Sequence, residues 1–416
     1  MRTLIKNIKQ IVQYESTPRP KVCGSAMSHI GTMDNAFLVI DDGRIAAVGP
    51  METLAAQPLG TFDSEVDATG RLVFPAFCDS HTHMVYAGSR EIEYIDKIRG
   101  LSYDEIAKRG GGILNSARRL QEADEAQLYD EAMQRLEAMA AHGTGAVEVK
   151  SGYGMTVEAE MKMLRVIRRM KETSPLTIKA TLLGAHGIPM EYRGRQEQFV
   201  DMVVDEMIPR AADEGLADFV DVFCDEGFFT VRDTERILEA GARRGLRAKI
   251  HANELACSGG IQVAVKHGAL SCDHLEFTGE AEIACLLKSD CMPTVLPGAA
   301  FFLNMQHAPV RQMMEAGLPV ALASDYNPGS SPSGNMQLIL SFACVSYRML
   351  PEEALNATTL NSAYAMGVSD RLGSIAVGKE ANLFITRPIP NYEYMPYAYG
   401  ENKVQTMFVG GRRIVG

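Results

Sequence analysis

The sequence predicts an α/β protein: a closed (β/α)8 barrel, or TIM barrel, with a small composite β domain formed by the N- and C-terminal segments. The first observation is that residues 145–329 switch repeatedly between short β-type runs and amphipathic helical patterns, which is typical of βα units. The second is that, with the run at 72–83, there are eight such strands. Eight nearly continuous apolar strands, each followed by a helix, favour a closed barrel over an open doubly wound sheet.

The predicted elements follow one another in order. The barrel strands are expected at 72–83, 145–152, 177–187, 217–227, 247–254, 269–277, 291–298 and 319–327. Helical patterns connect them, for example at 157–172 and 231–245. Short strands with tight glycine turns are expected on either side, at 3–15, 36–49, 65–70, 373–388 and 404–416. We therefore expect the barrel at 71–368, with 1–70 and 369–416 combining into the β domain.

Composition narrows the class of protein. The formal charge of −11 over 416 residues argues against non-specific nucleic-acid binding, although one local arginine can still bind an anionic small molecule. The eight cysteines show no C-x-x-C spacing, as expected for reduced thiols in the cytoplasm. The N-terminal residues alternate apolar and polar side chains, so neither a signal peptide nor a membrane partner is expected.

Polar side chains gather at the predicted C-terminal strand ends, where barrel active sites form. These side chains are His81, His83, Lys150, Tyr153, His186, Asp225, Glu226, His251, His274 and Asp325. Three imidazoles and a carboxylate suit Zn²⁺ or Fe²⁺. A lone H-x-H pair arises readily by chance, but the joint pattern favours a metal site. The expected ligands are His81, His83, His251 and Asp325.

The expected metal count is one. A two-metal site needs a further bridging anion, often a carboxylated lysine after the fourth strand, and the segment "VFCDEG" offers none. Lys150 ends the second strand and is expected to form salt bridges instead. The remaining histidines fall in predicted loops or helix ends, where solvated or capping roles are expected: His29, His142, His267 and His307.

Taken together, these residues resemble the amidohydrolase superfamily. Within it, the sequence resembles the imidazolonepropionases, which open a ring during histidine breakdown. The motifs, in order, are "HTHMVYAGSR", "RGGGI", "EVKSGYG", "LGAHG", "HANE", "CDHLE" and "SDYNPGSSPS". Asn253 and Tyr326 depart from that pattern, which has Asp and Phe there, and neither is an expected ligand.

The resemblance implies hydrolysis of 4-imidazolone-5-propanoate to N-formimidoyl-L-glutamate, with one zinc or iron per chain and a homodimer. It implies that substrate or product contacts Arg90, Tyr103, Tyr153, His186, Glu254, Asn327, Gly329 and Ser330, with Tyr103 the weaker candidate. Glu254 is expected to take a proton from water and deliver it to the leaving nitrogen, a role that Asp325 could share. His274 would orient the water or stabilise the developing oxyanion.

Two further features are expected to hold the anionic substrate. Arg90 would bind its carboxylate in bidentate geometry, although a surface ion pair with Glu91 or Glu93 would also explain this residue. The turn "NPGSSPSG", at 327–334, would offer free backbone N–H groups to a second anion, although ordinary loops share its composition.

Two other functions remain open. One is a deaminase of the same superfamily that acts on a purine, pyrimidine or related ring and releases ammonia. The other is a non-catalytic scaffold that keeps the barrel, with or without the metal, and binds partners. Such a protein would not need to keep the metal ligands or the catalytic base, whereas this sequence has all of them. Assays of bound metal and of released ammonia distinguish the three.

Overall fold

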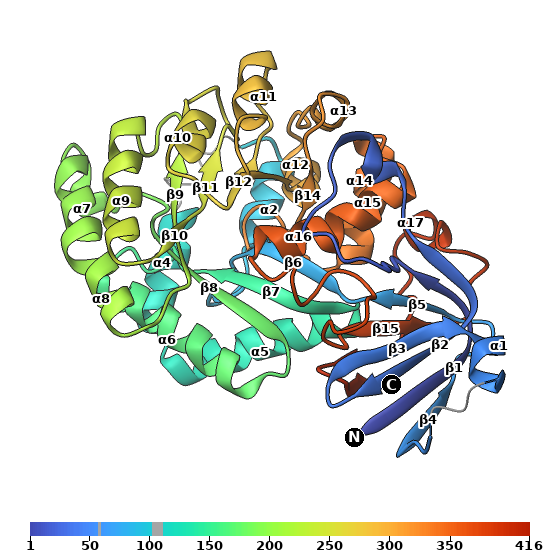
Figure 1. Cartoon of the computed structure of the whole chain (residues 1–416). Coiled ribbons are helices and arrows are strands. Elements are labelled where there is room, and N and C mark those ends of the chain that lie inside the picture. Colours follow the sequence, from blue (N-terminus) through green and yellow to red (C-terminus); the bar gives the residue numbers. More distant parts are fainter. Residues whose placement is uncertain (57–59, 102–110) are drawn as a thin grey trace.

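A computed structural model describes residues 1–56, 60–101 and 111–416. Eight parallel strands form the barrel at the upper left of Figure 1. They are β6 (Phe77–Thr82), β7 (Thr144–Lys150), β8 (Thr177–Ala185), β9 (Phe219–Cys224), β11 (Ile250–Ala252), β12 (Ser271–His274), β13 (Met292–Val295) and β14 (Ala321–Leu322). A two-residue strand, β10 (Arg247–Ala248), also pairs with β9.

The ring closes between its first and last strands. The backbone N–H of Asp325 donates to the His81 carbonyl at 3.0 Å, and that of His83 donates to the Tyr326 carbonyl at 2.9 Å. Thr82 and Tyr326 form the parallel bridge between these segments. The predicted (β/α)8 barrel is therefore confirmed, and its closure brings the first and eighth strand ends together.

Helices surround the barrel and cover one end of the small sheet. They are α1 (Met51–Ala56), α2 (Glu91–Ile98), α4 (Ile113–Glu122), α5 (Glu125–Ala141), α6 (Val157–Thr173), α7 (Gln196–Met202), α8 (Ile208–Asp213), α9 (Val231–Arg243), α10 (Gly260–Lys266), α11 (Glu280–Leu286), α12 (Pro297–Leu303), α13 (Val310–Glu315), α14 (Met336–Ser346), α15 (Pro351–Thr358), α16 (Leu360–Ala365) and α17 (Tyr394–Tyr397). Short 3₁₀-helices lie at Gly24–Ser28 and Met190–Tyr192, and a π-helical segment, Val203–Met207, lies between α7 and α8. Within the described ranges, none of the helices has the length and apolar character needed to cross a bilayer.

Helix α6 shows how the sequence specifies these elements. The Thr156 side chain accepts a hydrogen bond from the Ala159 N–H and so caps the first turn. Leu164 and Ile167 lie on the buried face, and α6 packs against β8. The helix therefore begins at its cap and is held by apolar burial against the barrel.

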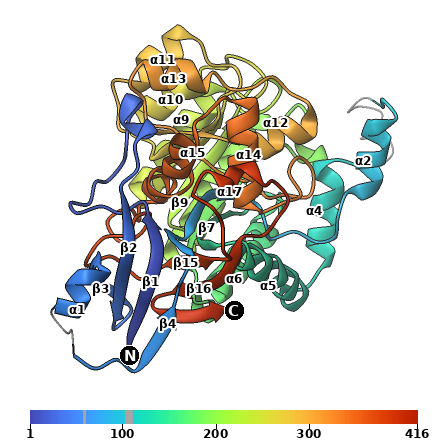
Figure 2. The same cartoon turned by 90° about the vertical axis from the view of Figure 1, so that its right-hand side faces the viewer.

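The two ends of the chain build one antiparallel-rich sheet, seen beside the barrel in Figures 1 and 2. Its strands run in the order β17, β16, β15, β5, β1, β2 and β3, with β4 paired to β1. Their bounds are β1 (Arg2–Val12), β2 (Thr32–Asp41), β3 (Arg44–Pro50), β4 (Ser64–Asp67), β5 (Leu72–Pro75), β15 (Leu383–Thr386), β16 (Val404–Val409) and β17 (Arg412–Val415). The predicted composite β domain is thus confirmed.

One predicted strand is divided between the two sheets. The run at 72–83 was expected to be a single barrel strand, but Leu72–Pro75 pairs with β1 and β15 in the small sheet. Only Phe77–Thr82 joins the barrel, where it pairs with β7. Both halves are buried, so an apolar run does not reveal to which sheet each half belongs. The expectation of one strand there is wrong.

Charged side chains are buried inside the barrel, beneath the strand ends. Lys150 Nζ lies 2.6 Å from Glu148 Oε1, 2.8 Å from Asp221 Oδ2 and 3.7 Å from Asp273 Oδ2. Lys249 forms a second ion pair with Glu148. Removing one partner from such a network costs about 3–5 kcal/mol, because it leaves a buried charge uncompensated. The expected salt-bridging role of Lys150 is confirmed, and the network fixes the acidic side chains under the site.

Candidate active site

Four donor atoms converge at the closed end of the barrel. His81 Nε2 lies 3.2 Å from His83 Nε2 and 3.5 Å from Asp325 Oδ1. His83 Nε2 lies 3.4 Å from His251 Nε2 and 3.6 Å from Asp325 Oδ1. Atoms about 2.1 Å from a common centre, at tetrahedral angles, would lie about 3.4 Å apart. The donor atoms of His81, His83 and Asp325 thus lie within 4.8 Å of one another, and His251 joins them through His83, at separations close to those around one tetrahedral ion.

Buried carboxylates fix which nitrogen of two rings faces this centre. His81 Nδ1 lies 2.7 Å from Asp273 Oδ2, and His251 Nδ1 lies 3.0 Å from Asp221 Oδ2. Each Nδ1 can donate its proton to the carboxylate, which leaves Nε2 with a free lone pair. Burial acts to raise the pKa of Asp221, but His251 and Lys150 outweigh it and hold that pKa below its ordinary value. Asp221 is therefore an ionised acceptor.

The donor set fits a divalent cation. Burial lowers the pKa of both His81 and His83 well below the ordinary histidine value. Both rings are thus neutral near pH 7, so an extra proton does not bridge their facing nitrogens. Three imidazoles and one carboxylate suit a divalent metal such as zinc or ferrous iron.

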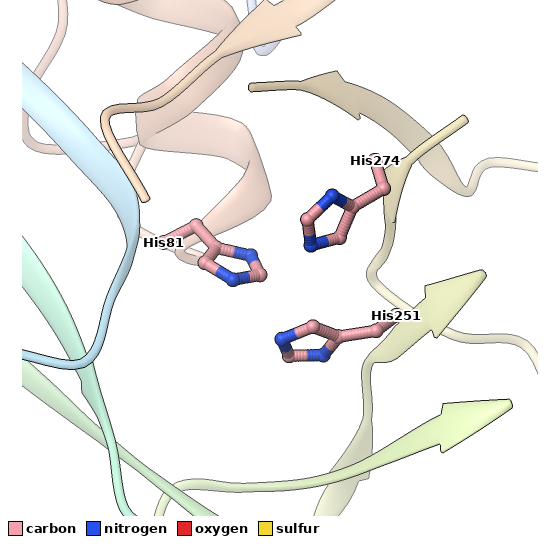
Figure 3. Close-up of side chains that lie close together, drawn as sticks. All are labelled: His81, His251 and His274. Atoms are coloured by element: carbon pink, nitrogen blue, oxygen red, sulfur yellow. The ribbon is translucent and has the colours of Figure 1, made fainter. Parts of the chain in front are cut away.

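His274 joins the cluster from β12. Figure 3 shows the rings of His81, His251 and His274 pointing into a shared space, and their nitrogens lie within 4.8 Å of one another. His274 Nε2 lies 3.5 Å from Glu254 Oε2, so this ring also faces the expected base. Its backbone has φ 85°, a strained conformation for a non-glycine residue. Such strain at a cluster of polar groups is typical of a functional site.

Glu254 reaches the cluster on a turn held from below. The carboxylate of Asp225 accepts hydrogen bonds from the backbone N–H groups of Glu254 and Leu255 at 2.7 and 2.9 Å. The Glu254 side chain is 14% exposed. Burial, together with the nearby Asp325 and Asp225 carboxylates, raises the pKa of Glu254 to about 8. The group can therefore exchange a proton near neutral pH.

A cavity of about 420 Å³ opens above these groups. Its lining includes the expected site residues His83, Arg90, Tyr153, His186, His251, Glu254, His274, Asp325, Asn327, Gly329 and Ser330. His81 lies beneath it with no exposed surface. Tyr103 lies outside the described residues. Apart from these two, the structure places every expected site residue on one cavity wall.

Arg90 lies at the side of this cavity. Its Nε donates to Ser116 Oγ at 2.8 Å, and its guanidinium is 5.8 Å from the centre of the Tyr153 ring. The expected alternative, a surface ion pair, is present only at the 4.0 Å limit with Glu93 Oε2. Arg90 Nη2 is buried and has no hydrogen-bond partner among the described residues. A buried N–H without an acceptor suggests that a ligand supplies one.

The turn after β14 does not match its expected role. The backbone N–H groups of Gly329 and Ser330 both donate to Asn327 Oδ1 at 2.8 Å. These two N–H groups are not free to bind a second anion, so for Gly329 and Ser330 the expectation is wrong. The reason is local: an asparagine side chain can satisfy the N–H groups that follow it and so close its own turn.

Residues that depart from the family pattern, and the other histidines, have structural roles. Asn253 has φ 56° and donates to the Phe277 carbonyl at 2.7 Å. Asparagine tolerates this left-handed conformation better than most residues. The remaining histidines lie outside the cavity lining: His29, His142, His267 and His307. His142 Nδ1, for example, lies 2.8 Å from the Ala138 carbonyl at a helix end, as expected of a capping group.

Other groups at the site were not found from the sequence. Asp221 and Asp273 lie within strands and not at strand ends. In the sequence, Asp221 is two residues before "FC" and Asp273 is next to His274, and only these positions could have indicated that they belong to the site. Ser116 and Lys97 come from helices, outside the strand-end pattern that guided the search. Lys97 lines the same cavity as Arg90.

Comparison with known proteins agrees with this geometry. Residues 72–414 match the model of the amidohydrolase family. The chain belongs to the amidohydrolase family. An imidazolonepropionase from Flavobacterium johnsoniae is 50% identical over 414 residues, which cover 100% of both chains. One from Geobacillus kaustophilus is 41% identical and covers 100% of this chain and 98% of its own. The resemblance to imidazolonepropionases is therefore confirmed across the whole sequence.

Solved structures of other amidohydrolase-like enzymes share the fold. A triazine hydrolase variant has a TM-score of 0.75 at 16% identity, covering 100% of this chain and 94% of its own. An adenosine deaminase from Xanthomonas campestris with bound zinc has a TM-score of 0.68 at 16% identity, covering 99% and 92%. At this identity the likeness concerns the barrel and its β domain.

Removing one donor should empty the metal site. We predict that His251→Ala lowers bound zinc plus iron, measured by mass spectrometry of the metals, to a small fraction of one per chain. His29, which is exposed and lies outside the cavity lining, provides the control. The His29→Ala variant should keep the wild-type content of zinc plus iron. Full metal content in a folded His251→Ala protein would contradict this assignment.

Proposed function

We propose that this amidohydrolase hydrolyses 4-imidazolone-5-propanoate to N-formimidoyl-L-glutamate, the reaction for which its imidazolonepropionase relatives are named. The observation that carries the proposal is one cavity that joins a metal-suited cluster to Arg90, whose buried Nη2 has no acceptor among the described residues. The substrate has the matching chemistry, because its cyclic amide must be hydrolysed and its propanoate tail carries a charge.

We propose one zinc or iron ion per chain, held by His81, His83, His251 and Asp325. Such an ion lowers the pKa of a neighbouring water, so that hydroxide is available near neutral pH. Its charge would also favour ionised Glu254, the form that accepts a proton. The lack of a lysine at the end of β9 supports a count of one.

Glu254 moves the proton in this proposal. Water adds to the ring carbonyl, the ring C–N bond breaks, and the nitrogen leaves the former carbonyl carbon. Glu254 takes the proton from the water and gives it to that nitrogen, which stays attached through the formimidoyl carbon. No ammonia is released, and a second carboxylate is formed. Asp325 could share the proton transfer, since burial raises its pKa to about 7.

His274 faces the developing oxyanion. Burial and the neighbouring His251 keep the pKa of His274 well below its ordinary value, so the ring is neutral and carries one N–H. That N–H can donate to the oxygen as negative charge accumulates there. At the substrate end, Arg90, Tyr153 and His186 would surround the ring and its tail.

We also propose that the protein is located in the cytoplasm and that it forms a homodimer. All eight cysteines are free thiols, which suits a reducing compartment.

An apolar hollow between α14 and α17 includes the exposed side chains of Val345, Tyr397 and Tyr399. Monomers seldom expose large apolar patches, so this surface supports self-association. Sedimentation velocity should report the mass of two chains, and a single-chain mass would contradict it.

Glu254→Gln should separate proton transfer from metal binding. We predict that the variant keeps its metal but loses about 10²-fold or more in kcat, the usual scale for a general acid or base. The wild-type kcat should also fall as the pH drops and Glu254 becomes protonated, and the variant should lack that acidic limb. An unchanged kcat would move the role to Asp325 or His274.

The reaction itself is tested with a panel of substrates. The purified protein is given 4-imidazolone-5-propanoate, guanine, cytosine or adenosine, while loss of the ring chromophore and release of ammonia are followed together. We predict rapid loss of the imidazolone chromophore without ammonia. Turnover of a nucleobase or nucleoside with ammonia, and none of the imidazolone, would show a deaminase instead.

A further inference from the structure

A second cation lies at the Arg90 end of the cavity. Lys97, in the last turn of α2, is half-buried and lines the cavity. Its Nζ donates to the Gly329 carbonyl at 3.2 Å. An ammonium group carries three N–H bonds. Across residues 1–56, 60–101 and 111–416, this carbonyl is the one acceptor that it meets within hydrogen-bond distance, so two donors remain for a ligand.

Arg90 approaches the same glycine. A Cβ atom placed on Gly329 would lie 2.3 Å from Arg90 Nη1, so the guanidinium packs directly on the glycine backbone. Lys97 and Arg90 therefore both contact Gly329, and Arg90 Nη2 is buried with no acceptor in the part of the chain that the structure describes. Glu93 Oε2, 4.0 Å from Arg90 Nε, offsets part of the positive charge of Arg90.

The neighbouring loop does not compete for an anion. The N–H groups of Gly329 and Ser330 already donate to Asn327 Oδ1. Among the described residues, Arg90 and Lys97 are the cationic donors that line this end of the cavity. Burial and the adjacent Arg90 lower the pKa of Lys97, and a bound carboxylate would offset both effects.

Packing determines where Lys97 is placed. Tyr94 stacks on Phe302 with ring centroids 5.1 Å apart, which fixes α2 against α12. Lys97 Nζ lies 6.0 Å from the centre of the same Phe302 ring. The Lys97 ammonium therefore lies near the contact between α2 and α12 as well as in the cavity lining.

We propose that Lys97 and Arg90 together bind the propanoate carboxylate of the substrate, so that Lys97 is a specificity-determining residue of this site. The inference rests on the proposed function, since it concerns how that substrate is held. Arg90 offers a planar pair of donors, and Lys97 offers a point charge beside the same glycine, Gly329. The tail would thus be fixed while the ring faces Glu254 and the metal cluster.

The test compares a charged tail with a neutral one. Lys97→Met and Lys97→Arg are assayed with 4-imidazolone-5-propanoate and with its uncharged propanamide. The matched control is Arg99→Met, which removes an exposed cation from the end of the same helix, outside the cavity lining. Binding of imidazole propanoate and imidazole propanamide, which cannot be hydrolysed, is measured in parallel by calorimetry.

We expect Lys97→Met to raise KM for the propanoate about tenfold or more, on the scale of a charge-assisted hydrogen bond, while KM for the propanamide changes little. Lys97→Arg should restore most of the loss, and Arg99→Met should behave as wild type. An equal rise for both substrates would show that Lys97 only holds α2 in place and would overturn the inference. An unchanged KM would overturn it as well.

Calorimetry separates this inference from the proposed reaction. If wild type binds imidazole propanoate more tightly than the propanamide, and Lys97→Met removes the difference, the carboxylate site stands even without turnover of the imidazolone. If wild type opens the ring but Lys97→Met leaves that difference intact, the reaction stands and the role of Lys97 fails.

Discussion

The hydrogen bonds from His81 to Asp273 and from His251 to Asp221 determine how the whole site is arranged. Both carboxylates are fully buried, and Lys150 lies between them, 2.8 Å from Asp221 and 3.7 Å from Asp273. Lys150 offsets part of their charge, and the carboxylates in turn fix the tautomer and direction of each ring. The buried network in the barrel thus holds the histidine rings in place. Their facing Nε2 lone pairs are kept close together, although they would repel one another in the absence of a cation.

The cavity has two regions that suit different chemical groups. At its floor, neutral histidines and buried carboxyl groups suit a metal ion and proton transfer near neutral pH. At its side, Arg90 and Lys97 suit a carboxylate, and the two regions are connected by Tyr153 and His186. A small ring with an acidic tail can reach both regions at once, whereas a nucleobase has no carboxylate to offer the buried Nη2 of Arg90. The spacing of charges along one cavity therefore favours ring opening over deamination.

Much of this arrangement could be predicted from the sequence, because the C-terminal ends of all eight strands of a (β/α)8 barrel lie together at one end of the barrel. His81, His251 and Asp325 are far apart in the chain, and yet their positions after apolar strands were enough to place them together. The split of residues 72–83 between two sheets could not be predicted, since buried strands look alike in either sheet. The N–H groups after Asn327 were misjudged because a side chain competes for them, and Lys97 was missed because packing of α2 on α12 places it.

The most direct test of this account is anomalous diffraction from crystals grown with imidazole propanoate, collected at the zinc and iron absorption edges. The account predicts one peak, about 2.0–2.2 Å from His81 Nε2, His83 Nε2, His251 Nε2 and Asp325 Oδ1. It also predicts the ligand carboxylate between Arg90 and Lys97. Two metal peaks, a peak elsewhere, or a ligand whose carboxylate lies on the metal would contradict it.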